Sequence, residues 1–116
     1  MKTQQPTALL VEDDGAIREA LTELLETTGY RVNAFATAEQ GIASLRTESV
    51  SLLVTDYVLP GENGSWLVRQ SRAEGLLQAT LVVMVTALLT PPEIADVRVL
   101  RKPLDLGQLL KEVSLP

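Results

Sequence analysis

The apolar positions of this chain form short strand-like runs that are separated by stretches with helical spacing. The runs stop abruptly at polar residues or alternate with them, which is typical of strands, and they cover residues 7–11, 30–35, 50–55, 81–86 and 97–100. Apolar residues three and four positions apart predict helices after Asp14 and across residues 37–46, 65–74 and 104–113. Because strands alternate with helices, the pattern predicts an α/β domain with a parallel sheet.

The interval between the last two predicted strands is short for a helical crossover. Such connections usually need about a dozen residues, whereas only residues 87–96 separate these two strands. The run Thr90-Pro91-Pro92-Glu93 fits a capping box with proline at the first helical position. The sequence therefore predicts a shortened fourth helix of one or two turns.

Composition limits the chemistry that is available to the protein. A chain of 116 residues is sized for one domain. It contains no cysteine and no histidine, which removes disulfides, thiolate metal sites and the commonest general base. The net charge is −5 and no segment is strongly basic, so we expect no nucleic-acid binding by this domain.

The chain also lacks the patterns of membrane association and export. Its longest apolar stretch, residues 76–89, is interrupted by polar residues and is too short to span a bilayer. Residues 1–6 are polar and have no signal-peptide core. We therefore expect a cytoplasmic protein with no membrane contact.

Charged residues stand at the ends of three predicted strands: Glu12-Asp13-Asp14 after the first, Asp56 after the third and Lys102-Pro103 after the fifth. The carboxyl ends of parallel strands share one edge of a sheet, where ligands bind. Carboxylates that lie close together repel one another unless a cation sits among them. Oxygen ligands of this kind suit a hard divalent ion, and the sequence predicts a Mg²⁺ site.

Asp56 is the predicted reactive group. A carboxylate at a strand end can attack phosphorus and become an acyl phosphate. Mg²⁺ held by Asp13 and Asp56, with Glu12 bound directly or through water, would neutralise part of the phosphoryl charge. Lys102, the Thr86 hydroxyl and the Ala87 N–H would stabilise the remaining oxygens. A single aspartate at a strand end is commonly a turn former or helix cap, so this interpretation depends on all the strand-end groups together.

The chain resembles the receiver domains of two-component response regulators over essentially its full length. The resemblance is carried, in this order, by LLVEDDGAIR, LLVTDYVLPGENG, VVMVTA and RKPL. It implies a flavodoxin-like, doubly wound, five-stranded parallel sheet of order 2-1-3-4-5, with residues 7–116 as the receiver domain and residues 1–6 as a flexible N-terminus. It also implies a phosphorelay role, in which a histidine kinase or histidine phosphotransfer protein phosphorylates the domain and a downstream effector reads the result.

The resemblance assigns roles to individual residues. Glu12 and Asp13 match the metal-binding acidic pair, and Asp56 matches the phosphoacceptor. Thr86 matches the phosphate-sensing hydroxyl and Lys102 the phosphate-contacting lysine. The last protein ligand of the metal would be the carbonyl of Tyr57 or Val58, and the family places it at Val58. The domain would act as a signalling phosphoacceptor and not as an enzyme.

Three positions depart from the family pattern. Val99 stands where most receivers have an aromatic residue that rotates inward, so we expect signalling through another surface or through ordering of residues 87–96. Val58 and Leu88, which would flank the phosphoryl group, are apolar and cannot orient water, which predicts slow self-dephosphorylation.

Two other classes of protein fit some of the same residues. A hydrolase of the haloacid dehalogenase type also uses Asp, Thr, Lys and acids around Mg²⁺, but it requires a second Asp where this chain has Val58. A pseudo-receiver would bind partners without phosphorylation. The altered switch position favours this reading, whereas the complete set of site residues disfavours it.

Overall fold

The computed structural model of the protein describes residues 5–91 and 93–115. They form a five-stranded parallel sheet of order β2-β1-β3-β4-β5, which confirms the predicted flavodoxin-like topology. The strands are β1 (Thr7–Val11), β2 (Arg31–Phe35), β3 (Leu52–Asp56), β4 (Leu81–Thr86) and β5 (Val97–Arg101). The central strand β3 is buried along its whole length, as expected for a strand covered on both faces. Of the N-terminus predicted to be flexible, residues 1–4 lie outside the described residues, and residues 5–6 precede β1 without regular structure.

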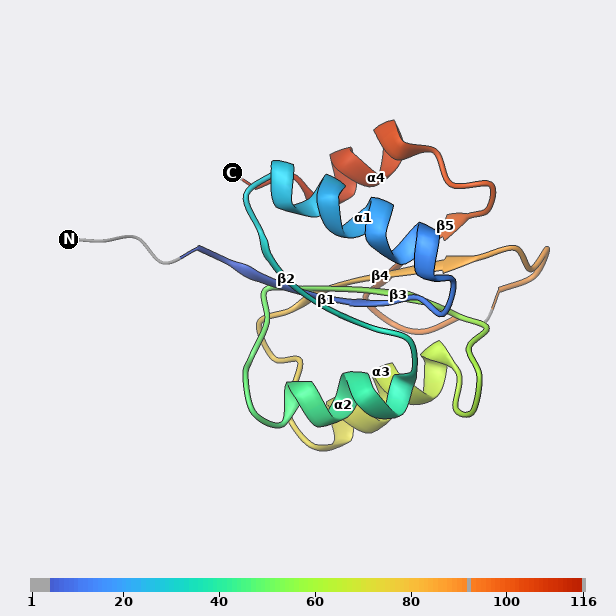
Figure 1. The fold of residues 1–116 in the computed structure, drawn as a ribbon. Coiled ribbons are helices and arrows are strands. Elements are labelled where there is room, and N and C mark those ends of the chain that lie inside the picture. The colour runs from blue at the N-terminus through green and yellow to red at the C-terminus, as the bar shows by residue number, and fades with distance from the viewer. Residues whose placement is uncertain (1–4, 92, 116) are drawn as a thin grey trace.

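Helices cover both faces of the sheet. One face carries the first and last helices in the chain and the other face carries the middle two (Figure 1): α1 (Gly15–Thr27) with α4 (Leu106–Val113), and α2 (Ala38–Leu45) with α3 (Gly64–Ala73). Within the described residues, no helix has both the length and the apolar character needed to cross a membrane.

The period-two pattern of the strands explains why the core has two halves. In β1, Ala8 and Leu10 point into the cluster that packs beneath α1 and α4. Leu9 and Val11 point the other way, into the cluster beneath α2 and α3. Successive side chains of a strand face opposite sides, so one apolar strand supplies both layers. This double burial is the reason that the strands read as nearly continuous apolar runs.

Side-chain caps fix where the helices begin. Asp14 caps α1, and its Oδ1 accepts a hydrogen bond from the N–H of Ile17 at 3.0 Å, so this helix begins directly after Asp14 as predicted. The predicted starts of the last two helices are off by one and two residues. Asn63 caps α3 and Asp105 caps α4, so these helices begin at Gly64 and Leu106. Short polar side chains at such positions satisfy N–H groups that have no partner within the helix.

The connection between β4 and β5 differs from the prediction. None of its described residues, 87–91 and 93–96, is helical, so the shortened fourth helix is wrong for this part of the chain. Pro92, at the centre of the predicted capping box, lies outside the described residues. Two consecutive prolines remove two N–H donors and push the residue before each of them away from helical geometry. In so short a segment, these restrictions outweigh the capping signal.

Irregular chain takes the place of that helix. Ile94 packs against the apolar cluster that lies beneath α2 and α3. Arg72 of α3 holds the far end of the connection, donating to the carbonyl of Ala95 at 2.7 Å and to that of Asp96 at 3.4 Å. Asp96 has a φ of 59°, which turns the chain into β5. The end of the parallel crossover is therefore held in place by Arg72, a side chain of α3.

Candidate functional site

The strand-end groups identified in the sequence meet at one edge of the sheet. Glu12 directly follows β1, Asp56 and Thr86 end β3 and β4, and Lys102 directly follows β5. The N–H of Lys102 donates to the carbonyl of Thr86 at 2.8 Å, which fixes the register of β5 against β4 at this edge. Parallel pairing thus brings residues from both ends of the sequence to the same place.

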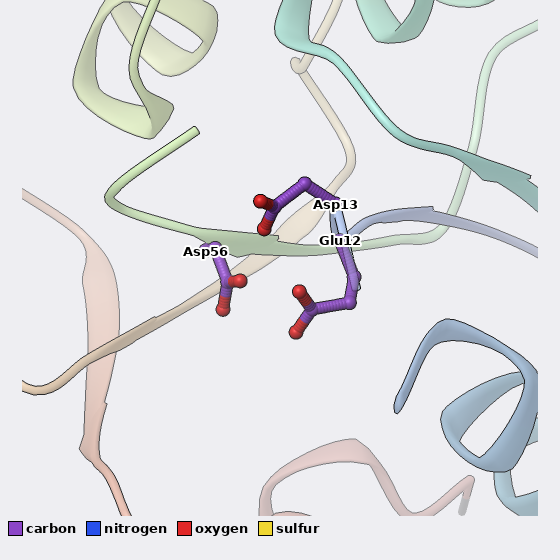
Figure 2. A group of neighbouring side chains, drawn as sticks. All are labelled: Glu12, Asp13 and Asp56. Carbon is purple, nitrogen blue, oxygen red and sulfur yellow. The ribbon is translucent and has the colours of Figure 1, made fainter. Parts of the chain in front are cut away.

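Three carboxylates form an acidic cluster at this edge: Glu12, Asp13 and Asp56. One oxygen of each lies within 4.8 Å of the others. Figure 2 shows the three side chains turned toward a shared space. Glu12 and Asp56 are only 3% and 5% exposed, whereas Asp13 is exposed. Buried carboxylates at this spacing are unfavourable when all are ionised, and oxygen donors so arranged suit a hard cation.

Arg18 holds the turn that carries two of these acids. Its Nη1 donates to the carbonyl of Glu12 at 2.9 Å and approaches that of Asp13 at 3.4 Å. On the other side of the turn, the N–H of Asp14 donates to Glu12 Oε2 at 3.0 Å. The backbone of the turn is therefore held by Arg18 of α1, and the Glu12 carboxylate is oriented by the N–H of Asp14. Arg18 was not predicted from the sequence, although its position four residues after the helix cap Asp14 places it beside the turn.

Lys102 forms an ion pair with Asp56. The distance between Lys102 Nζ and Asp56 Oδ1 is 3.2 Å. The Lys102–Pro103 peptide bond is cis, an isomer that the X-Pro sequence allows. One cation thus faces a cluster of three carboxylates, which leaves the site with excess negative charge.

Burial and the neighbouring carboxylate raise the pKa of Glu12 from 4.5 to about 7. Burial of the carboxyl group is the largest cause, and a hydrogen bond with Asp56 and repulsion from its charge act in the same direction. The N–H of Asp14 and the charge of Lys102 lower the pKa and offset part of this rise. In the metal-free protein, the Glu12 carboxyl is therefore only partly ionised near neutral pH.

Thr86 lies at the inner side of the site and is 2% exposed. Its Oγ1 accepts a hydrogen bond from the N–H of Leu88 at 3.0 Å, so its own hydroxyl hydrogen is available for another acceptor. Ala87, the other predicted oxyanion donor, follows directly and is exposed. Val99, in β5, is half-buried.

The loop after β3 begins directly after Asp56 and leads to α3. Val58, the predicted carbonyl ligand, lies in this loop with its side chain 66% exposed. The loop closes at Gly64, whose N–H donates to the carbonyl of Tyr57 at 2.8 Å. A Cβ at position 64 would lie 2.2 Å from the carbonyl oxygen of Asp56, so no larger residue fits. The close approach of Gly64 to Asp56 was not predicted from the sequence.

Comparisons with known proteins agree with this geometry. The profile of the family described as "Response regulator receiver domain" matches residues 8–114. The response regulator receiver protein CpdR of Brucella abortus (strain 2308) is 35% identical over 112 residues, which cover 91% of this chain and 92% of that protein. The transcriptional regulatory protein AfsQ1 of Streptomyces coelicolor is 39% identical over 82 residues. The chain covers only 35% of its length, so it corresponds to one part of that larger regulator.

Solved structures give the same result for the fold. The receiver domain of the hybrid histidine kinase CckA superposes with a TM-score of 0.81 at 28% identity, covering 92% of this chain and 94% of that domain. The family match extends over nearly the whole sequence, and the acidic cluster lies where parallel strands end. The chain belongs to the response regulator receiver domain family.

Proposed function

We propose that the protein is a phosphoacceptor in a two-component phosphorelay and that Asp56 receives the phosphoryl group. The observation that carries this proposal is the pairing of the buried Asp56 with Lys102 at 3.2 Å, inside a cluster of three carboxylates. The donor would be a phosphohistidine of a histidine kinase or histidine phosphotransfer protein. The receiver domain would comprise residues 7–116.

The chemistry needs little more than positioning and charge. A carboxylate oxygen of Asp56 attacks phosphorus while the bond from phosphorus to the histidine nitrogen breaks, so the phosphoryl group changes partner without redox chemistry. Lys102 then contacts a phosphoryl oxygen in place of the free carboxylate. The Thr86 hydroxyl and the Ala87 N–H donate to the other oxygens. Groups that are fixed before reaction stabilise the developing charge without reorganising.

The acidic cluster fits Mg²⁺ because all of its side-chain donors are carboxylate oxygens of the kind that hard cations prefer. Glu12, Asp13, Asp56 and the carbonyl of Val58 would hold the ion. When bound, Mg²⁺ neutralises charge on the phosphoryl oxygens. Binding at neutral pH also releases the proton that Glu12 holds at its raised pKa of about 7.

The signal would pass through Thr86 into the β4–β5 connection. The Thr86 Oγ1 is already bonded to the N–H of Leu88, so a shift of the hydroxyl toward a phosphoryl group would move the start of this connection. A downstream effector protein or domain would recognise the new arrangement. Val99 offers no aromatic ring for such a movement, and residues 87–96 would carry the change instead.

Phosphorylation by acetyl phosphate tests the proposal. With Mg²⁺, the wild type is expected to gain one phosphoryl group by intact-protein mass spectrometry, and Asp56→Asn is expected to gain none. Asp96→Asn, which makes the same change at an exposed aspartate outside the acidic cluster, is the matched control and should react like wild type. Phosphorylation of Asp56→Asn, or Mg²⁺-independent labelling of the wild type, would contradict the assignment.

A pseudo-receiver is the second candidate, and the irregular β4–β5 connection favours it. A protein of this kind would bind its partner equally well with and without beryllofluoride, which mimics the phosphoryl group. The phosphoacceptor proposal instead expects binding to change when beryllofluoride and Mg²⁺ are added together. Failure of wild type to react with either reagent would favour the pseudo-receiver.

A further inference from the structure

The connection between β4 and β5 is loosely packed against the rest of the domain. A cavity of about 740 Å³ lies along it, lined by Leu89 and Ile94 of the connection and by Val99 of β5. Leu89 is 83% exposed. Among the described residues of the connection, only the half-buried Ile94 packs against the cluster beneath α2 and α3. Because protein interiors are normally close-packed, a segment beside so large a gap is held by few apolar contacts.

Polar contacts hold the two ends of this connection. Within the described part of the chain, two side chains bond its backbone, one at each end. At the near end, the Thr86 Oγ1 accepts a hydrogen bond from the N–H of Leu88 at 3.0 Å. At the far end, Arg72 Nη1 donates to the carbonyl of Ala95 at 2.7 Å, and Nη2 approaches that of Asp96 at 3.4 Å. The near end therefore depends on the hydroxyl proposed to sense the phosphoryl group, and the far end depends on α3.

The backbone at the far end is in a conformation that needs such support. Asp96 has a φ of 59°, in the left-handed region that residues other than glycine populate sparsely. Arg72 bonds the carbonyl before this residue and approaches the residue's own. A bond from a charged donor is stronger than one between neutral groups. Since Arg72 is exposed, water can replace it at these carbonyls, so the contact is able to open.

We propose that Arg72 is a latch: its bonds keep the β4–β5 connection in a resting position and oppose the movement that a phosphoryl group on Asp56 drives through Thr86. The inference rests on the proposed function. Residues 87–96 join the two ends without a helix among those described, so movement of the near end pulls on the far end. Phosphorylation and loss of the latch then favour the same released state, and the two are linked reciprocally.

A nitroxide label on the connection tests the latch. The chain contains no cysteine, so Glu93→Cys places a single labelling site on an exposed residue. Electron paramagnetic resonance then measures the ratio of mobile to immobile label. Arg72→Met keeps an unbranched apolar side chain but lacks the guanidinium. It is expected to raise this ratio about fivefold, the factor that corresponds to the loss of one hydrogen bond.

Titration with beryllofluoride and Mg²⁺ distinguishes a latch from a merely structural contact. In wild type, beryllofluoride is expected to increase the mobile population. Arg72→Met should bind beryllofluoride more tightly, by up to about fivefold, because a larger fraction of its molecules already occupies the released state. A residue with only a structural role would leave this affinity unchanged or lower it.

Two further substitutions serve as controls. Arg69 is also exposed on α3, and none of its contacts with described residues is a hydrogen bond to the connection. Arg69→Met should therefore match wild type in both measurements. Arg72→Lys keeps the charge but replaces the guanidinium fork with one ammonium group, so its mobile population should lie between those of wild type and Arg72→Met. Cooperative thermal unfolding of each variant verifies that it is folded.

The outcomes separate this inference from the proposed function. Equal label mobility in wild type and Arg72→Met would overturn the latch. Equal or weaker beryllofluoride binding by Arg72→Met would overturn its opposition to phosphorylation. If beryllofluoride binds neither protein, the proposed function fails, whereas a higher mobile population in Arg72→Met would still support Arg72 as the group that holds the resting connection.

Discussion

At the scale of single residues, the site is organised by side chains that need not touch the phosphoryl group. Arg18 is the clearest case, because its guanidinium bonds the carbonyl of Glu12 and approaches that of Asp13. It thereby fixes the backbone of the turn that carries the Glu12 and Asp13 carboxylates. Preorganised ligands bind an ion more tightly because less order has to be created on binding.

Removing that guanidinium should weaken Mg²⁺ binding. Arg18→Met is expected to raise the Mg²⁺ dissociation constant about fivefold, corresponding to about 1 kcal/mol for the lost hydrogen bonding. The dissociation constant of Arg18→Lys should lie between those of the wild type and Arg18→Met. Titration calorimetry measures the change, and Arg69→Met on the exposed side of α3 controls for the lost charge. Tighter binding by Arg18→Met would show that charge repulsion, and not positioning, dominates.

The raised pKa of Glu12 predicts how stability depends on pH. In metal-free protein the folded state binds this proton more strongly than the unfolded state, because the pKa rises from 4.5 to about 7 on folding. The stabilisation is complete below pH 4.5 and is lost as the pH rises toward 7, by up to about 3 kcal/mol. Urea unfolding between pH 5 and 8 measures it. Glu12→Gln should show a flatter profile, and an identical slope in both proteins would contradict the assignment.

Two apolar residues that the family pattern places beside the phosphoryl group predict a long-lived phosphoaspartate. Val58 and Leu88 offer no group that could orient an attacking water, so the half-life of phosphorylated protein should be minutes or longer. Val58→Asn, which adds an amide, is expected to shorten the half-life severalfold. The decay is followed after removal of the donor by intact-protein mass spectrometry. A wild-type half-life of seconds would refute the prediction.

At the scale of elements, the start of α3 is coupled to the end of β3. Gly64 is the first residue of the helix, and a Cβ there would lie 2.2 Å from the carbonyl oxygen of Asp56. The loop between them is therefore closed by direct contact between backbones, and the position of Asp56 depends on it.

Gly64→Ala is expected to destabilise the protein by about 1–3 kcal/mol, because overpacking forces the backbone to shift. It should also weaken Mg²⁺ binding, since Asp56 would move. Denaturant unfolding measures the first effect and calorimetry the second. Gly15→Ala is the matched control: its Cβ would be 3.6 Å from the nearest atom, Arg18 Nη2, so stability should be unchanged or slightly higher. Equal effects of the two substitutions would argue against the close-contact explanation.

The β4–β5 connection shows where sequence reasoning fails. The starts of α1 and α2 were predictable because a short polar side chain directly precedes apolar residues at helical spacing in both cases. The capping signal around Thr90 was of the same type, but residues 87–96 are too few and too rich in proline to complete a helix. The end of this segment is held by a hydrogen bond from Arg72 of α3 to the carbonyl of Ala95, and the local sequence contains no information about this bond.

At the scale of the whole molecule, the sheet order and the convergence of the acids followed from the alternation of strands and helices and from the family motifs. The distances could not be predicted in this way. The 3.2 Å contact between Lys102 and Asp56, the cavity of about 740 Å³ along the β4–β5 connection and the contact at Gly64 depend on packing among segments distant in sequence. Patterns fix which residues share an edge, and tertiary packing fixes how closely they approach.

Because the proposed ion site joins the ends of β1 and β3, two neighbouring strands of the sheet, Mg²⁺ should stabilise the domain as a unit. At a concentration one hundred times the dissociation constant, the free energy of unfolding should rise by about 2.7 kcal/mol. Thermal unfolding with and without Mg²⁺ measures this. Asp13→Ala should respond much less, and an equal rise in this variant would place the ion elsewhere.

The pairing of Asp56 with Lys102 also has a consequence during synthesis. The aspartate leaves the ribosome well before the lysine, which directly follows the last strand of the sheet. A half-made chain thus exposes its carboxylates without their cationic counterpart. Until β5 pairs with β4, the nascent protein therefore lacks the complete group of side chains at this edge of the sheet.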